Sequence, residues 1–175
     1  LARRDHNTSK TAPVISSSLD LLEQFTKQLP YLLTSDQTLV ISEIMQDLRC
    51  GHPMMRLIQG DVGCGKTTVA FASAFIAAVN NYQTAMMAPT ESLALQHFIK
   101  FKEHFSTIPA DILLGSTSKK DRQAILSRLS NSTTLVLFGT HSLIEDSVCF
   151  ENLGLVIVDE QHKFGVEQRI RLSSK

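Results

Sequence analysis

One stretch of the sequence decides the fold: Met54-Met55-Arg56-Leu57-Ile58-Gln59-Gly60-Asp61-Val62-Gly63-Cys64-Gly65-Lys66-Thr67. From Gly60 to Thr67 it matches the phosphate-loop pattern G-x-x-x-x-G-K-[ST] at every fixed position. A short apolar run at 54–58 precedes the match, and a stretch rich in Ala and Phe follows at 67–79. The order of strand, glycine-rich turn and helix is the context that such a loop requires.

The residue types in this loop suit the phosphates of a bound nucleotide. Glycines let the backbone curl so that consecutive N–H groups face a phosphate, and the helix N-terminus adds its positive dipole end. Lys66 brings a charge to the β- and γ-phosphates of ATP, and the Thr67 hydroxyl can ligate Mg²⁺. A glycine-rich turn with a capping threonine is the alternative interpretation. The predicted nucleotide-binding residues of the loop are Gly60, Asp61, Val62, Gly63, Cys64, Gly65, Lys66, Thr67 and Thr68.

Outward from the loop, short apolar runs alternate with helical stretches. Two helices are expected before the loop, one at 21–29 that ends at Pro30 and one that begins at Thr34 or Ser35. Beyond the loop, helices are expected after Pro89 and at 119–129. This alternation predicts an α/β fold with a mainly parallel sheet of five or more strands, covered by helices on both faces. The further apolar runs lie at 84–88, 111–114, 135–138 and 155–158.

A second chemical feature follows the last apolar run, where 155–158 leads into Asp159-Glu160-Gln161-His162. A strand that ends in two carboxylates places them at the carboxyl edge of the sheet, which predicts a position near the phosphate loop. Asp159 would hold Mg²⁺ through its water shell, and Glu160 would orient or deprotonate the water that attacks the γ-phosphate. Lys66, Asp159 and Glu160 are therefore the predicted catalytic residues. Gln161 and His162 could sense the γ-phosphate and couple its state to motion. An acidic helix N-terminus is the alternative.

The composition indicates a globular chain without a strongly charged surface. Of 175 residues, 43% are hydrophobic, which excludes a disordered or fibrous protein, and no apolar run is long enough to span a membrane. Lys plus Arg and Asp plus Glu both number 17, so a nucleic acid would have to be held by local groups and backbone amides. The first 20 residues are polar and predict a partly disordered linker. Three widely spaced cysteines favour a reducing cytoplasm.

Together these motifs resemble those of superfamily-two helicases, and the set is similar to the RecG family of bacterial ATP-dependent DNA helicases. The resemblance implies a RecA-like P-loop NTPase fold for residues 21–175, which would form the first, ATP-binding motor lobe and stop soon after the acidic motif. Cys64 stands where this family usually has Ser, and Lys163 where it usually has Arg. The four segments that carry the resemblance are Gln59-Gly60-Asp61-Val62-Gly63, Ala88-Pro89-Thr90-Glu91, Gly139-Thr140-His141 and Asp159-Glu160-Gln161-His162 followed by Lys163-Phe164-Gly165-Val166.

The resemblance also implies roles for residues outside the two motifs. Gln37 matches a position that reads the adenine edge, and Tyr31 matches an aromatic position that could stack on the base. Ordinary packing for Tyr31, a solvated helix face for Gln37 and helix capping for Thr90 remain as alternatives. The residues that match positions on a DNA backbone are Pro89, Thr90, Gly115 and Thr140.

By the same resemblance, the protein would couple ATP hydrolysis, with Mg²⁺, to the remodelling of branched DNA such as stalled forks and Holliday junctions. The implied partners are branched DNA and, in the same polypeptide, a second helicase lobe and an N-terminal wedge domain, with no membrane. The setting would be the bacterial cytoplasm. The segment alone is expected to be largely inactive because the arginine finger comes from the second lobe. Three alternatives stay open: a lobe of a transcription-repair coupling factor-like translocase, a self-contained P-loop kinase and a non-catalytic nucleotide-dependent module.

Overall fold

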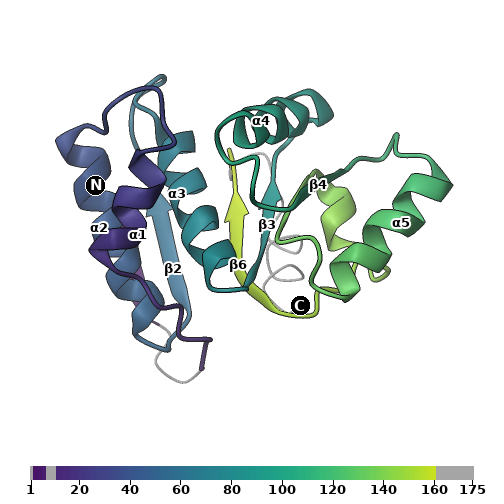
Figure 1. Cartoon of the computed structure of the whole chain (residues 1–175), viewed down its shortest axis with the longest axis horizontal. Helices are drawn as coiled ribbons and strands as arrows, with labels where there is room; N and C mark the ends of the chain where they lie inside the picture. Colours follow the sequence, from purple (N-terminus) through teal and green to yellow (C-terminus); the bar gives the residue numbers. More distant parts are fainter. Residues whose placement is uncertain (1, 7–10, 161–175) are drawn as a thin grey trace. The chain divides into compact units, whose positions relative to one another are not determined.

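The computed structural model describes residues 2–6 and 11–160. The chain folds as two compact units, residues 1–80 and residues 81–175, and each is described by itself. Figure 1 shows the helices and strands of both units coloured along the sequence. Among the described residues, no helix is long and apolar enough to cross a membrane.

The described residues of the first unit form three helices and two strands. The helices α1 and α2 both contact α3, and the rings of Phe25 and Phe75 lie 5.7 Å apart between α1 and α3. Helix α1 begins after Ser18, whose hydroxyl accepts a hydrogen bond from the backbone N–H of Leu21. Of the two residues that the sequence allows at the start of α2, Thr34 is the one that caps it. The elements are β1 (Ala2–His6), α1 (Leu19–Thr26), α2 (Ser35–Arg49), β2 (Met54–Ile58) and α3 (Lys66–Val79).

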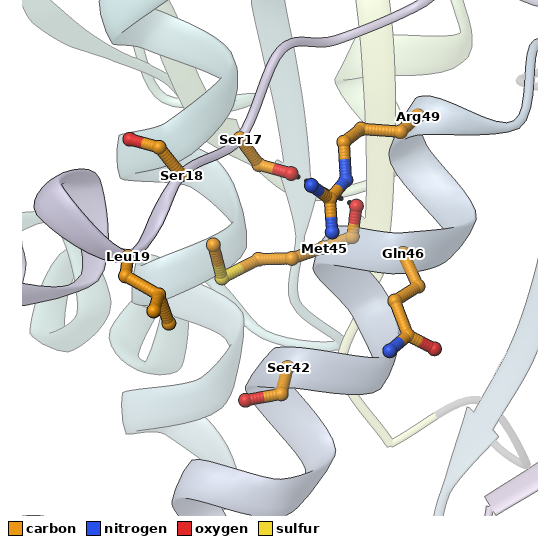
Figure 2. A pocket seen from close by; sticks show the side chains of 7 residues that line it. All are labelled: Ser17, Ser18, Leu19, Ser42, Met45, Gln46 and Arg49. Atoms are coloured by element: carbon orange, nitrogen blue, oxygen red, sulfur yellow. Dashed lines mark hydrogen bonds between the residues drawn. The ribbon is translucent and has the colours of Figure 1, made fainter.

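Part of the segment that was expected to be a linker packs onto α2. The Ile15 side chain is only 1% exposed, and its backbone N–H donates to the carbonyl of Leu48 at 2.9 Å. The Ser17 hydroxyl donates to the carbonyl of Met45 at 2.9 Å. Residues 11–18 therefore differ from the expectation because the Ile15 side chain is buried and because one backbone N–H and one hydroxyl of this segment bond to α2. A pocket of about 150 Å³ lies beside this segment. Figure 2 shows the side chains that line it, which are Ser17, Ser18, Leu19, Ser42, Met45, Gln46 and Arg49.

The strand that leads into the phosphate loop has an antiparallel neighbour. Strand β2 pairs with β1 in a register that runs from Ala2 opposite Ile58 to His6 opposite Met54. The prediction of five or more strands in one mainly parallel sheet is therefore wrong in number for the described residues. The backbone N–H and C=O groups along this edge of β2 form hydrogen bonds with β1. The polar composition of β1 had not suggested a strand.

The second unit contains a four-stranded parallel sheet, which confirms the predicted α/β class. The strand order is β4-β5-β3-β6, and every neighbouring pair is parallel. A short 3₁₀ helix, η1, follows β5 and was not predicted. The elements are β3 (Gln83–Met87), α4 (Glu91–His104), β4 (Ala110–Leu113), α5 (Lys119–Ser130), β5 (Val136–Gly139), η1 (His141–Ile144) and β6 (Leu153–Val158).

Helices cover both faces of this sheet, as the continuous apolar strands predict. Successive side chains of a strand point to opposite faces of the sheet, so Leu137 and Phe138 of β5 pack against different helices. Leu137 belongs to a buried cluster that includes Leu129 of α5. Phe138 instead faces α4, where the rings of Phe98 and Phe101 lie 5.9 and 5.4 Å from its ring. The two central strands, β3 and β5, are buried along their whole length.

Candidate functional site

The phosphate loop has the backbone conformation that its glycines predict. Gly63 and Gly65 both have φ of +83°, in the left-handed region that L side chains rarely adopt. Gly65 is the N-cap of α3, and a Cβ built on it would lie 2.1 Å from Nε2 of Gln37. The torsion angle therefore favours glycine at 65, and a side chain there would also displace the end of the Gln37 side chain. The loop and the N-terminus of α3 form a set of backbone donors suited to an anion.

The side chain of Lys66 lies over its own loop. Its ammonium donates to the carbonyl oxygens of Gly60 and Asp61, both at 2.8 Å, and lies 3.8 Å from Sγ of Cys64. These are neutral acceptors on the backbone and one weak acceptor. An arriving phosphate would offer charged oxygens instead, for which an ammonium forms stronger hydrogen bonds. The Lys66 ammonium, which carries the positive charge predicted to bind phosphate, therefore lies against the phosphate loop.

Gln37 contacts the phosphate loop directly. Its Oε1 accepts from the backbone N–H of Thr34 at 3.0 Å, which completes the capping box of α2, and its Nε2 donates to the carbonyl of Cys64 at 3.1 Å. A primary amide has two N–H donors and two acceptor lone pairs, so each group keeps one capacity for another partner. The implied contact with adenine stays a prediction, to which the structure adds a link between α2 and the loop.

Tyr31 and Thr68 are joined by a hydrogen bond. The phenol and hydroxyl oxygens lie 3.0 Å apart. Tyr31 is 46% exposed, whereas Thr68 is buried in the first turns of α3. The exposed ring remains available for stacking on a base, which stays a prediction. The contact assigns Thr68 a structural partner that the loop motif did not suggest.

The acidic pair lies at the carboxyl end of β6, as predicted. The N–H of Asp159 donates to the carbonyl of Met87 at 2.8 Å, which extends the ladder between β6 and β3 by one residue. The next residue, Glu160, has φ of +49° and donates its N–H to Oδ1 of Asp159 at 3.0 Å. A non-glycine residue in this region costs about 1–3 kcal/mol, and such residues cluster at active sites, although Asn81 and Ser132 also have positive φ in turns of this chain. Gln161 and His162, the predicted coupling residues, lie outside the described residues.

Sequence reasoning missed the residue that holds Asp159. Nε2 of His97, on α4, lies 2.8 Å from Oδ2 of Asp159. The His97 side chain is 6% exposed and the Asp159 side chain is 31% exposed. The available signal was the position of His97 on the buried stripe of α4 between Ala94 and Phe101, where an imidazole requires a polar partner.

The predicted DNA contacts fall into two groups. Thr90 is exposed at the start of α4 and caps it, with its hydroxyl accepting from the N–H of Leu93 at 3.2 Å, so the alternative role is present. Gly115 is exposed after β4, and Pro89 precedes Thr90 after β3. Thr140 is only 3% exposed, so its hydroxyl does not reach the surface that the prediction requires.

Glu91 connects two of these segments, which the sequence did not suggest. Its Oε1 accepts from the N–H of Ser116 at 3.1 Å, and its Oε2 accepts from the Ser116 hydroxyl at 2.7 Å. The hydrogen bonds from the Ser116 hydroxyl and amide lower the pKa of Glu91 below its usual value. The carboxylate therefore holds the loop after β4 against the N-terminus of α4.

Two residues, one in each unit, carry oxygen donors of the kind that Mg²⁺ takes beside a nucleotide. In the part of the chain that the structure describes, no three His, Cys, Asp or Glu residues form a metal-binding group. Mg²⁺ commonly takes one or two carboxylates together with phosphate oxygens and water, which are hard oxygen ligands. Thr67, on the first turn of α3, and Asp159 supply oxygens of this kind.

Comparison with known proteins gives a consistent result. A family model described as DEAD/DEAH box helicase matches residues 34–174. ATP-dependent DNA helicase RecG of Synechocystis sp. is 43% identical over 99% of the chain and 21% of its own length. The protein of the same name from Thermotoga maritima is 47% identical over 89% of the chain and 20% of its own length. The chain thus spans about a fifth of the length of these relatives.

A solved structure shows the same fold. The structure of RecG bound to a three-way DNA junction matches with a TM-score of 0.79 and 42% identity. The match covers 87% of this chain and 21% of that one. At this identity the likeness extends beyond the fold to the sequence.

Proposed function

Because the chain belongs to the DEAD/DEAH box helicase family, we propose that it is the ATP-binding motor lobe of a RecG-like helicase that couples ATP hydrolysis to remodelling of branched DNA in recombination and repair. The observation that carries the proposal is the phosphate loop, with Gly63 and Gly65 in the left-handed conformation and Lys66 folded over the loop carbonyls. The intact protein would also contain a second lobe and a wedge domain. The 175-residue segment alone would hydrolyse ATP slowly.

In this proposal each predicted site residue has a role in ATP binding or hydrolysis. The loop amides and Lys66 would bind the phosphates, and Thr67 and Asp159 would hold Mg²⁺, which would neutralise charge on the phosphates. Glu160 orients or deprotonates the attacking water. Gln37 and Tyr31 contact the base. The backbone strain at Glu160 supports its assignment, because strain of this kind concentrates at active sites.

DNA would be held through its backbone. Thr90 and the loop at Gly115 are exposed at the carboxyl ends of β3 and β4, and Glu91 fixes one against the other through Ser116. Hydroxyl and amide contacts with phosphates carry no sequence information, which suits a motor that moves along DNA. The choice of branched DNA rests on the relative whose structure contains a three-way junction.

The test is steady-state ATP hydrolysis by the intact protein without DNA, with linear duplex and with forked duplex. We expect forked DNA to stimulate turnover most, and Lys66→Ala to abolish turnover and weaken nucleotide binding because it removes the charge that faces the transferring phosphate. Lys27→Ala, which changes a lysine whose side chain is 75% exposed on α1, is the matched control and should leave turnover unchanged.

Other outcomes would support other functions. Equal stimulation by linear and forked duplex would favour a translocase like the transcription-repair coupling factor. ATP turnover that DNA does not change, with phosphate transferred to a small molecule, would favour a kinase. Nucleotide binding without turnover in the intact protein would favour a non-catalytic module.

A further inference from the structure

A buried histidine holds the carboxylate at the end of β6. His97 lies on α4, seven residues beyond the Thr90 cap, with its side chain 6% exposed. Its Nε2 lies 2.8 Å from Oδ2 of Asp159, whose side chain is 31% exposed. The histidine therefore approaches from the protein interior, while part of the carboxylate still faces solvent.

Both ends of this contact are anchored independently. His97 shares the buried stripe of α4 with Phe101, whose ring lies 5.4 Å from the ring of Phe138 in β5. The backbone of Asp159 is fixed by the 2.8 Å hydrogen bond from its N–H to the carbonyl of Met87 in β3. The hydrogen bond thus joins a packed helix to the end of a paired strand, so the backbones that carry His97 and Asp159 are both held in place.

The two oxygens of Asp159 have different donors. Oδ1 accepts from the backbone N–H of Glu160 at 3.0 Å, and Oδ2 faces His97. Two donors, one on each oxygen, fix the plane of the carboxylate as well as its position. A carboxylate has about four lone-pair sites, which is more than these two donors use.

We propose that His97 is a positioning residue, which holds the carboxylate of Asp159 in the orientation that receives the magnesium–nucleotide. The inference rests on the proposed function and names a further residue of the same site. Residues that hydrogen-bond a metal-binding group typically change metal affinity or activity by about 10- to 100-fold when they are replaced. The role depends on the N–H group that His97 directs at Asp159. A residue that places an N–H group at the same distance from the backbone should therefore preserve metal binding.

The experiment compares two variants of His97 in the intact protein. His97→Leu keeps an apolar body but removes the donor, whereas His97→Gln places an amide nitrogen the same number of bonds from the backbone as Nε2. His104→Leu makes the same chemical change in the last turn of α4, where the ring lies 6.1 Å from the ring of Phe105. Binding of Mn²⁺ is measured by electron paramagnetic resonance with ATP present, and ATP binding is measured separately in EDTA.

We expect His97→Leu to weaken Mn²⁺ binding about 10-fold and to leave ATP binding in EDTA unchanged. His97→Gln should recover most of the loss, and His104→Leu should match the parent. The inference is overturned if His97→Leu binds Mn²⁺ like the parent, if it loses ATP binding in EDTA to the same degree, or if Gln is no better than Leu. If the His97→Leu variant does not fold, the His97→Gln variant alone decides. A folded His97→Gln variant that binds Mn²⁺ about 10-fold more weakly than the parent also overturns the inference. A parent protein that shows no metal-dependent ATP binding would refute the proposed function instead.

Discussion

The guanidinium of Arg56 donates two hydrogen bonds to one carboxylate oxygen of Asp47, from Nη2 at 2.7 Å and from Nε at 3.0 Å. Both side chains are nearly buried, at 7% and 6% exposure, and Arg56 also contacts the more exposed Glu43. Burial by itself lowers the pKa of Arg56, but the hydrogen bonds that it donates to Asp47 and Glu43 outweigh this effect and raise the pKa above its usual value. The pair joins β2, which leads into the phosphate loop, to α2, which carries Gln37.

Replacing Arg56 with Met should destabilise the first unit. The change removes the cation that faces a buried carboxylate, and breaking a buried ion pair in this way typically costs about 3–5 kcal/mol. Urea unfolding of the intact protein measures the loss. The double variant Arg56→Met, Asp47→Leu should recover much of it, since no buried charge remains. A double variant as unstable as the single one would show that the pair does not act as a unit.

Replacing Glu160 with Gln should stop turnover while ATP still binds. The amide has nearly the same shape but cannot accept a proton, and losing a general base typically costs about 10²–10⁴ in rate. Turnover is measured with forked DNA, and binding is measured by titration with a fluorescent ATP analogue. Glu151→Gln, which changes an exposed carboxylate in the same unit, is the control. Turnover near the parent rate would remove Glu160 from the catalytic role.

Replacing Gln37 with Glu should reduce the preference for ATP over GTP. Glutamate keeps the acceptor that completes the capping box with Thr34, so α2 should begin normally. It lacks the N–H groups that bond Cys64 and that would reach the base. Competition binding of ATP and GTP measures the preference, which should fall about 10-fold, as expected for one lost polar contact. An unchanged preference, with a normally folded protein, would leave Gln37 with only its structural role.

Asp111 should make the second unit more stable at neutral pH than at low pH. Burial alone raises its pKa, but hydrogen bonds from Arg128, at 2.7 and 3.0 Å, and from Thr134 outweigh this and hold the pKa below the usual value of 3.8. A depressed pKa in the folded state means that the contribution is complete above the unfolded value of about 3.8 and is lost as the pH falls through the lower, folded value.

The variant Asp111→Asn tests this pH dependence. At pH 7 it should cost roughly 1–2 kcal/mol, less than a fully buried pair because the Arg128 side chain is 42% exposed. The difference from the parent should shrink as the pH falls below about 3.8. Asp146→Asn, at an exposed position in the same unit, is the control. A gap in stability that stays constant from pH 7 to low pH would contradict the role of the ionised carboxylate.

Features that depend on a few neighbouring residues could be predicted from the sequence. The left-handed glycines of the phosphate loop, the Thr34 cap of α2 and the position of Asp159 at a strand end all lie where the local pattern puts them. Each is determined by the torsion preferences and hydrogen-bonding groups of adjacent residues. The alternation of apolar runs and helices likewise predicted the α/β class.

Contacts between residues far apart in the sequence became visible only in the folded chain. His97 and Asp159 are 62 positions apart, and Glu91 and Ser116 are 25 positions apart. Such contacts depend on which side of a helix turns toward which strand end, and a periodic pattern gives the apolar stripe but not the partner of a polar residue within it. The pairing of β1 with β2 was missed for a related reason. A polar segment carries no hydrophobic signal of its own, and its strand conformation is fixed by backbone hydrogen bonds to a neighbour about 50 residues away.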